Sequence, residues 1–127
     1  MNKTGVTGLR RVWNAMFFSF AGLTAALKHE SAFRQECALA VVMLPAAFWV
    51  GGNAVEYSLL VGSVMLVLIV ELLNSAVEAV VDRVGTDAHT LSGQAKDMGS
   101  AAVFLSLLLV LFVWSAVIWD RWQGASL

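Results

Sequence analysis

Three long apolar stretches separated by short polar segments dominate the pattern of hydrophobic and polar positions along the chain. The first is continuous only over 37–50, short of the roughly 20 residues that a bilayer-spanning helix needs, so we extend it back to residue 31. The predicted transmembrane helices therefore cover residues 31–50, 56–83 and 98–120. Glycines and small polar residues predict a turn at 51–53 and a loop over 85–93.

The segment from about residue 8 to 28 has a different pattern. Its apolar residues recur at helical spacing on one side, and Arg10, Arg11 and Lys28 point away from that side. This arrangement is typical of an amphipathic helix that lies in the membrane surface. A secretory signal peptide is the alternative, but Lys28-His29-Glu30 stands where a small-residue cleavage site is needed, so we expect the segment to be retained.

Polar residues gather on one face where the second predicted span ends. At the helical repeat, Glu71, Asn74, Ser75, Glu78 and Asp82 project within an arc of about 100°, and the residues between them are apolar. Carboxylates in a membrane helix are unfavourable unless they line a wet cavity, a partner helix or a metal. We interpret this polar stripe as the active site of a membrane enzyme. The alternative is the solvated end of a helix.

Composition and charge support a membrane protein and give its orientation. The chain is 59% hydrophobic and 13% charged, with a mean hydropathy of +0.77, which excludes an ordinary soluble domain. Basic residues are frequent before the first span and absent from 51–70. The positive-inside rule therefore places the N-terminal third and the 82–97 segment in the cytoplasm. The net charge is −1, and we expect no nucleic-acid partner.

The candidate chemistry is carboxylate chemistry at that cytoplasmic face. The chain has no phosphate-binding loop, no dinucleotide fingerprint and no cysteine and histidine pattern for zinc. The groups that remain are Glu30, Glu71, Asn74, Glu78, Lys96 and Asp97. Carboxylates suit Mg²⁺, which completes its shell with water and substrate phosphates. The set fits phosphoryl transfer from a metal-bound nucleotide to a hydroxyl at the bilayer surface.

Three motifs carry a resemblance to a known family. The strings ESAFRQE, ELLNSAVEAVVDRVG and HTLSGQAKDMGSA resemble, in order and separation, the signature regions of the prokaryotic diacylglycerol kinases. The resemblance implies an all-α, homotrimeric protein of the bacterial inner membrane, with an N-terminal amphipathic surface helix and three transmembrane helices in one domain. It also implies phosphorylation of diacylglycerol by ATP, with Mg²⁺, to give phosphatidic acid.

Carried over position by position, the resemblance assigns a role to each candidate residue. It implies that Glu71 is the general base, that Glu30 and Glu78 hold the metal, and that Asn74 braces them. The expected ATP-binding residues are Arg11, Phe18, Glu30, Glu78, Asp87, His89, Lys96 and Asp97. The expected lipid-binding residues are Arg11, Ala15, Ser19, Phe20, Ala32, Phe33, Arg34, Glu36, Glu71 and Ser100. The chain departs from the family in a surface helix that is poor in basic residues between 15 and 27, and in Phe18, where a polar aromatic is expected.

Two other functions remain open at this point. A kinase of the same fold could act on undecaprenol, because the chemistry needs only a hydroxyl at the interface. A small transporter or assembly factor could use the glutamates to bind a cation or relay protons. Against transport, the ionisable groups crowd one face of the membrane, whereas transport sites usually lie near the midplane.

Overall fold

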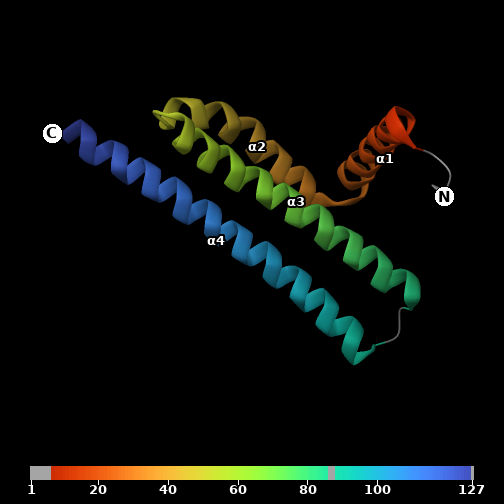
Figure 1. The fold of residues 1–127 in the computed structure, drawn as a ribbon. Helices are drawn as coiled ribbons and strands as arrows, with labels where there is room; N and C mark the ends of the chain where they lie inside the picture. The colour runs from red at the N-terminus through yellow and green to blue at the C-terminus, as the bar shows by residue number, and fades with distance from the viewer. Residues whose placement is uncertain (1–6, 86–87, 127) are drawn as a thin grey trace.

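The computed structural model describes residues 7–85 and 88–126, and within them the chain forms four α-helices and no strand. The helices are α1 (Gly8–His29), α2 (Ser31–Val50), α3 (Ala54–Val84) and α4 (Thr90–Ser126). The last three run side by side, whereas α1 stands at an angle near the start of α2 (Figure 1). The predicted all-α membrane fold, with an additional N-terminal helix, is confirmed.

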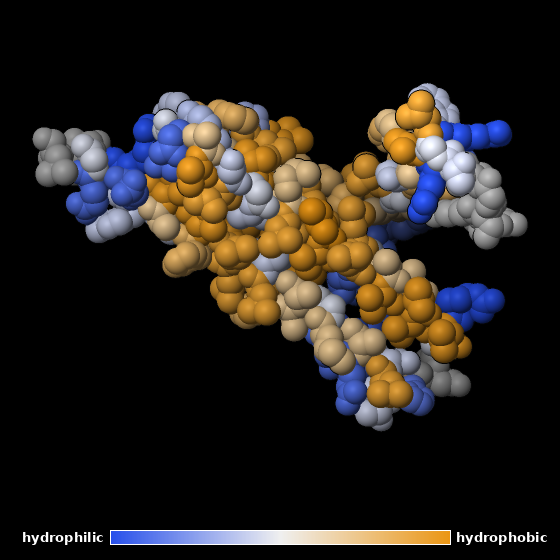
Figure 2. Space-filling view, in the orientation of Figure 1, coloured by the Kyte–Doolittle hydropathy of each residue, from blue (hydrophilic) through white to orange (hydrophobic). Residues whose placement is uncertain are grey.

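Three of these helices are long and apolar enough to cross a membrane. They are α2, α3 and the Thr90–Gly124 part of α4. Most of their large apolar side chains face outward, including Val41, Leu105 and Phe112, which are 72%, 64% and 72% exposed. Apolar residues cover the middle of the visible face, and hydrophilic residues gather at its ends (Figure 2). An apolar middle with polar ends is the surface of a protein that spans a bilayer.

The break between α3 and α4 is shorter than the loop predicted over 85–93. Helix α4 already begins at Thr90, where Nδ1 of His89 accepts a hydrogen bond from the backbone N–H of Leu91 (3.1 Å). The N–H of Gly93 bonds to the carbonyl of His89 (2.9 Å), so this glycine belongs to the first helical turn. Gln, Ala and Lys then continue the helix, because all three are good helix formers. Lys96 and Asp97 therefore sit on a rigid element.

The turn between α2 and α3 is closed by reciprocal hydrogen bonds. The side chain of Asn53 accepts from the N–H of Glu56 (2.9 Å), and the carboxylate of Glu56 accepts from the N–H of Gly52 (2.6 Å). Both satisfy donors near the start of a helix. A Cβ on Gly51 would lie 2.7 Å from the Tyr57 ring, so only glycine allows the chain to turn this closely.

A buried apolar cluster joins three helices in the half of the bundle nearest this turn. Ala47, Leu60 and Val117, from α2, α3 and α4, form the buried cluster. Small residues at helix interfaces allow the helices to approach closely. Ser63 and Ser106 are such residues, and their buried hydroxyls donate hydrogen bonds to carbonyls of their own helices (2.9 and 2.7 Å). This end of the bundle is therefore held by packing, and the polar stripe lies at the other end.

The buried cluster of Ala47, Leu60 and Val117 predicts that two adjacent leucines contribute differently to the free energy of unfolding. Leu60→Ala should lower the free energy of unfolding in mixed detergent micelles by about 2 kcal/mol or more, because Leu60 is 0% exposed and its loss leaves a cavity. Leu59→Ala, at a side chain that is 49% exposed, is the matched control and should change it by much less. Equal losses in both variants would contradict the packing of α3 described here.

Candidate active site

The polar stripe of α3 lies where three other segments converge. These are the α1–α2 junction, the first half of α2 and the first turns of α4 (Figure 1). Helix α3 is 31 residues long, more than the roughly 20 needed to span hydrocarbon, so its polar end reaches the interface. One end of the bundle therefore collects the candidate residues from all four helices.

Glu71 is the deepest of the carboxylates. It is 5% exposed, and its carboxyl group lies within hydrogen-bonding reach of that of Glu36 on α2. Oε2 of Glu36 is buried and has no hydrogen-bond partner. Two carboxyl groups in contact repel each other unless they share a proton, so this pair is suited to accepting one. The structure thus joins the residue expected to act as base with one expected near the lipid.

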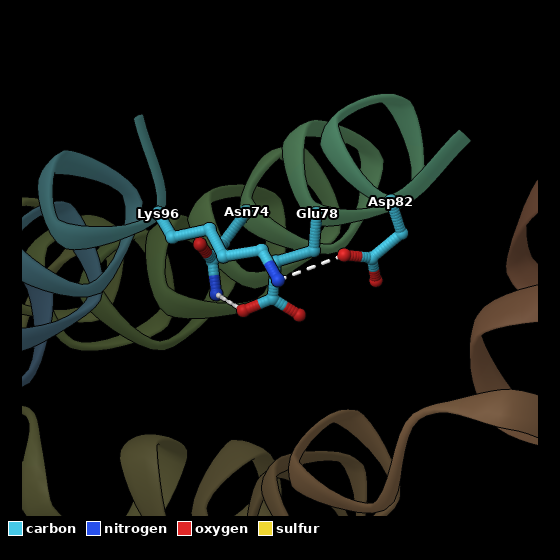
Figure 3. Close-up of polar contacts among 4 residues, drawn as sticks. All are labelled: Asn74, Glu78, Asp82 and Lys96. Atoms are coloured by element: carbon cyan, nitrogen blue, oxygen red, sulfur yellow. Dashed lines mark hydrogen bonds and ion pairs between the residues drawn. The ribbon is translucent and has the colours of Figure 1, made fainter. Parts of the chain in front are cut away.

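The next residues of the stripe form a polar group with α4 (Figure 3). Nδ2 of Asn74 donates to Oε1 of Glu78 at 3.5 Å, a long hydrogen bond that orients both side chains. Nζ of Lys96 crosses from α4 to Oδ1 of Asp82 at 2.7 Å. The charge of Glu78 also acts on Lys96. Because the Lys96 and Asp82 side chains are 45% and 63% exposed, their ion pair is readily exchanged for another partner.

Glu30 reaches the cluster from the other side. It is the single extended residue between α1 and α2 (φ −115°, ψ 108°), and its charge acts on Glu71. Beside it lies a cavity of about 760 Å³ between α1 and α3, called here the α1–α3 cavity. Its lining is mostly small or apolar, with Ser19, His29, Glu30 and Ser75 as the polar exceptions. This volume suits a small-molecule headgroup.

The donor set fits a magnesium ion that arrives with a nucleotide. Among the described residues, no three acidic, histidine or cysteine side chains converge as a complete metal site. Mg²⁺ needs only one or two carboxylates when phosphates and water supply its other ligands. Glu30 and Glu78 each act electrostatically on Glu71, so carboxylates of the kind that Mg²⁺ prefers lie near it.

The expected α1 residues lie at different distances from this cluster. Ser19 lines the α1–α3 cavity, and its hydroxyl donates to the carbonyl of Ala15 (2.9 Å). Phe20 is 63% exposed and Phe18 is half-buried. Arg11 is exposed and about five helical turns from the end of α1, so within this chain it is not brought to the carboxylates.

The α2 residues that were expected to bind the lipid differ in burial and in their contacts. Phe33 is 2% exposed and packs inside, whereas Ala32 is exposed. Nη1 of Arg34 donates to the carbonyls of Leu27 (2.9 Å) and Lys28 (3.2 Å), the last carbonyls of α1. Arg34 therefore holds α1 against the start of α2.

The expected α4 residues lie on or just before its first turns. Asp97 and Ser100 are exposed, and the ring of His89 is used as the helix cap described above. Asp87 lies outside the described residues. A nucleotide role for these residues stays a prediction.

Comparison with known proteins decides the family. Residues 17–118 match the family of prokaryotic diacylglycerol kinases, a span that includes the whole carboxylate cluster. The chain belongs to this family. Diacylglycerol kinases of Haemophilus influenzae and Escherichia coli K12 are 50% and 47% identical to it, over 88% and 91% of this chain and 95% and 94% of theirs. That of Pseudomonas aeruginosa is 48% identical over 90% of this chain and 93% of its own.

Sequence reasoning assigned no individual role to three residues that the structure brings to this cluster. Asp82 binds Lys96, Ser75 lines the α1–α3 cavity with a buried hydroxyl that has no partner, and Gly99 lies directly against Asn74. The helical projection already placed Asp82 and Ser75 on the stripe. Gly99 gave no such signal, because its contact depends on how α4 is aligned with α3.

The contacts of Arg34 predict a local effect on the end of α1. Arg34→Gln should speed amide hydrogen exchange in the last turns of α1 by about tenfold, because it removes two charge-assisted hydrogen bonds to their carbonyls. Lys28→Gln removes a charge from the same segment without removing either bond, and should leave the exchange unchanged. Equal exchange in the two variants would contradict the bracing role.

Proposed function

We propose that this chain transfers the γ-phosphoryl group of ATP to the free hydroxyl of diacylglycerol, giving phosphatidic acid and ADP. The observation that carries the proposal is the buried Glu71, which sits beside Glu36 and near the α1–α3 cavity, on the same helix face as Glu78. Family membership supports the substrate class, since the relatives at 47–50% identity are named diacylglycerol kinases. Undecaprenol is the alternative substrate, and an assay that offers both lipids distinguishes the two reactions.

In the proposed reaction, Glu71 accepts the proton of the lipid hydroxyl. The hydroxyl oxygen attacks the γ-phosphorus, the bond to the β–γ bridging oxygen breaks, and ADP leaves with that oxygen. Glu71 is 5% exposed, so water competes poorly for the site. The adjacent carboxyl group of Glu36 gives the abstracted proton a second oxygen with which it can be shared.

The nucleotide is proposed to bind over Glu78 and Lys96. Glu30 and Glu78 would hold the Mg²⁺ of MgATP, which neutralises phosphate charge when bound. Asn74 keeps Glu78 oriented through its Nδ2, and Lys96 exchanges Asp82 for a phosphate oxygen. Asp97, His89, Phe18 and Arg11 remain proposed nucleotide contacts.

The lipid is proposed to enter through the α1–α3 cavity, whose lining is mostly apolar and includes Glu30. The neighbouring α1 face, with Ala15, Ser19 and Phe20, and the 32–36 segment would border the acyl chains. Ser100 would lie on the opposite side of the headgroup. Binding the lipid beside the base holds the acceptor hydroxyl in place, which accounts for much of the catalysis in such a transfer.

The active site is proposed to lie on the cytoplasmic side of the bacterial inner membrane. Arg10, Arg11, Lys28, Arg83 and Lys96 lie toward the end of the molecule that carries the site. Of the described basic residues, Arg121 alone lies at the opposite end, next to Asp120. This distribution follows the positive-inside rule and puts the site where ATP is available.

The chain is proposed to act as a homotrimer. A single subunit leaves large apolar side chains exposed along α4 and the α1–α3 cavity open on one side. Nε1 of Trp114 is also buried without a partner. A neighbouring subunit would cover apolar surface and close the site.

The reaction is tested with purified protein, MgATP and mixed micelles that contain either diacylglycerol or undecaprenol. We expect transfer to diacylglycerol. Glu71→Gln should lower kcat by about 10²- to 10⁴-fold and leave MgATP affinity nearly unchanged, since it removes a base and no nucleotide contact. Glu78→Gln should lower both kcat and the affinity for MgATP.

Near wild-type kcat for Glu71→Gln at saturating lipid would show that another group is the base. Transfer to undecaprenol alone would replace the proposed substrate and leave the roles of the carboxylates intact. No transfer to either lipid would count against the kinase proposal as a whole.

The trimer proposal predicts active sites shared between subunits. Two inactive variants, Glu71→Gln and Ala15→Gln, are dissociated, mixed and refolded together. If α1 of a neighbouring subunit covers the open side of the site, mixed trimers regain part of the activity, because some sites then combine an intact Glu71 with an intact neighbouring α1. Mixtures that co-assemble, as shown by cross-linking, and yet stay inactive would mean that each subunit builds its own site.

A further inference from the structure

Gly99 on α4 lies directly against the side chain of Asn74 on α3. A Cβ built on Gly99 would overlap Oδ1 of Asn74 and lie 3.2 Å from its Cγ. A Cβ on any of the helical glycines Gly22, Gly62, Gly93 and Gly124 would have no neighbour within 4 Å. A side chain at residue 99 therefore requires the carboxamide of Asn74 to move.

This contact determines which way the carboxamide of Asn74 can point. Its Nδ2 reaches Glu78 at 3.5 Å, and its Oδ1 is buried without a hydrogen-bond partner. At Gly99 an α-hydrogen occupies the direction of the missing Cβ, so a Cα–H group faces this oxygen. The carboxamide is thus confined between the backbone of α4 and the carboxylate of Glu78.

We propose that Gly99 is a positioning residue for catalysis, which sets the Asn74 carboxamide and through it the Glu78 carboxylate. This inference rests on the proposed function, in which Glu78 binds the metal of MgATP. A methyl group at residue 99 displaces Oδ1, breaks the long hydrogen bond from Nδ2, and leaves Glu78 free to rotate away from the metal. The effect reaches the nucleotide without any contact between Gly99 and the substrate.

A purely structural role for Gly99 would be close packing of α4 on α3. The two roles differ in how they depend on Asn74. In an Asn74→Ala background the carboxamide is gone, and a Cβ at residue 99 would meet only the Cβ of residue 74, at 3.9 Å, an ordinary contact. Positioning through Asn74 would then have no further effect, whereas a clash between helix backbones would persist.

The experiment compares the intact protein with the variants Gly99→Ala, Asn74→Ala and the double variant. Gly93→Ala, on the same helix with open space around it, is the matched control. The Kd of each is measured for the magnesium complex of a non-hydrolysable ATP analogue, together with kcat and the KM for MgATP. Binding can be read even where turnover is lost.

We expect Gly99→Ala to weaken binding of the magnesium–nucleotide complex by roughly tenfold, because overpacking at this contact displaces Asn74. The double variant should bind like Asn74→Ala alone. Gly93→Ala should bind like the wild type, and the KM for the lipid should change little in any of them.

Two results would overturn the proposal: binding by Gly99→Ala that equals that of Gly93→Ala, or losses from Gly99→Ala and Asn74→Ala that multiply in the double variant. Wild-type binding and turnover in Asn74→Ala would instead remove Asn74 from the site, and the inference about Gly99 with it. Loss of kinase activity in the wild-type protein is a separate failure, which the lipid assay detects independently.

Discussion

Carboxyl groups on an apolar helix have to be shielded from hydrocarbon, and this requirement governs how the helices of the chain are arranged. Glu71 continues a helix whose preceding residues suit a bilayer. The other segments enclose it: α2 brings Glu36 into contact, the α1–α2 junction brings Glu30, and α4 lies against Asn74 through Gly99. The apolar outer faces of the same helices are left to the surrounding membrane. The same contacts between helices therefore shield the polar stripe from hydrocarbon and bring the candidate residues together.

The two ends of the bundle meet different demands. At the end with the Asn53–Glu56 cap, Leu60 and its neighbours are buried and the turn is closed by hydrogen bonds. At the other end, α1 has a single buried residue, Ala26, the Asn74–Glu78 hydrogen bond is long, and the Lys96–Asp82 ion pair is exposed. Binding sites are commonly drawn from the less stable parts of a fold, because substrates must enter and leave. The packed end fixes the alignment of α3 and α4, and that alignment places Lys96 and Gly99 over the stripe.

Much of the fold could be predicted because the length of an apolar run is a property of the sequence alone. The helical repeat likewise put Glu71, Asn74 and Glu78 on one face before any partner helix was known. What could not be predicted depends on alignment between helices: the meeting of Glu36 with Glu71, and of Gly99 with Asn74. The early start of α4 was missed because glycines in 85–93 indicated a loop, whereas the His89 ring caps a helix there.

The single extended residue between α1 and α2 has a mechanical consequence. Glu30 is the only residue between the two helices, and it also carries a carboxylate toward Glu71. Any change in the angle of α1 pivots about this residue, so the α1 side of the α1–α3 cavity and the Glu30 carboxylate move together. The width of the cavity and the charge presented to Glu71 are therefore set by one backbone position.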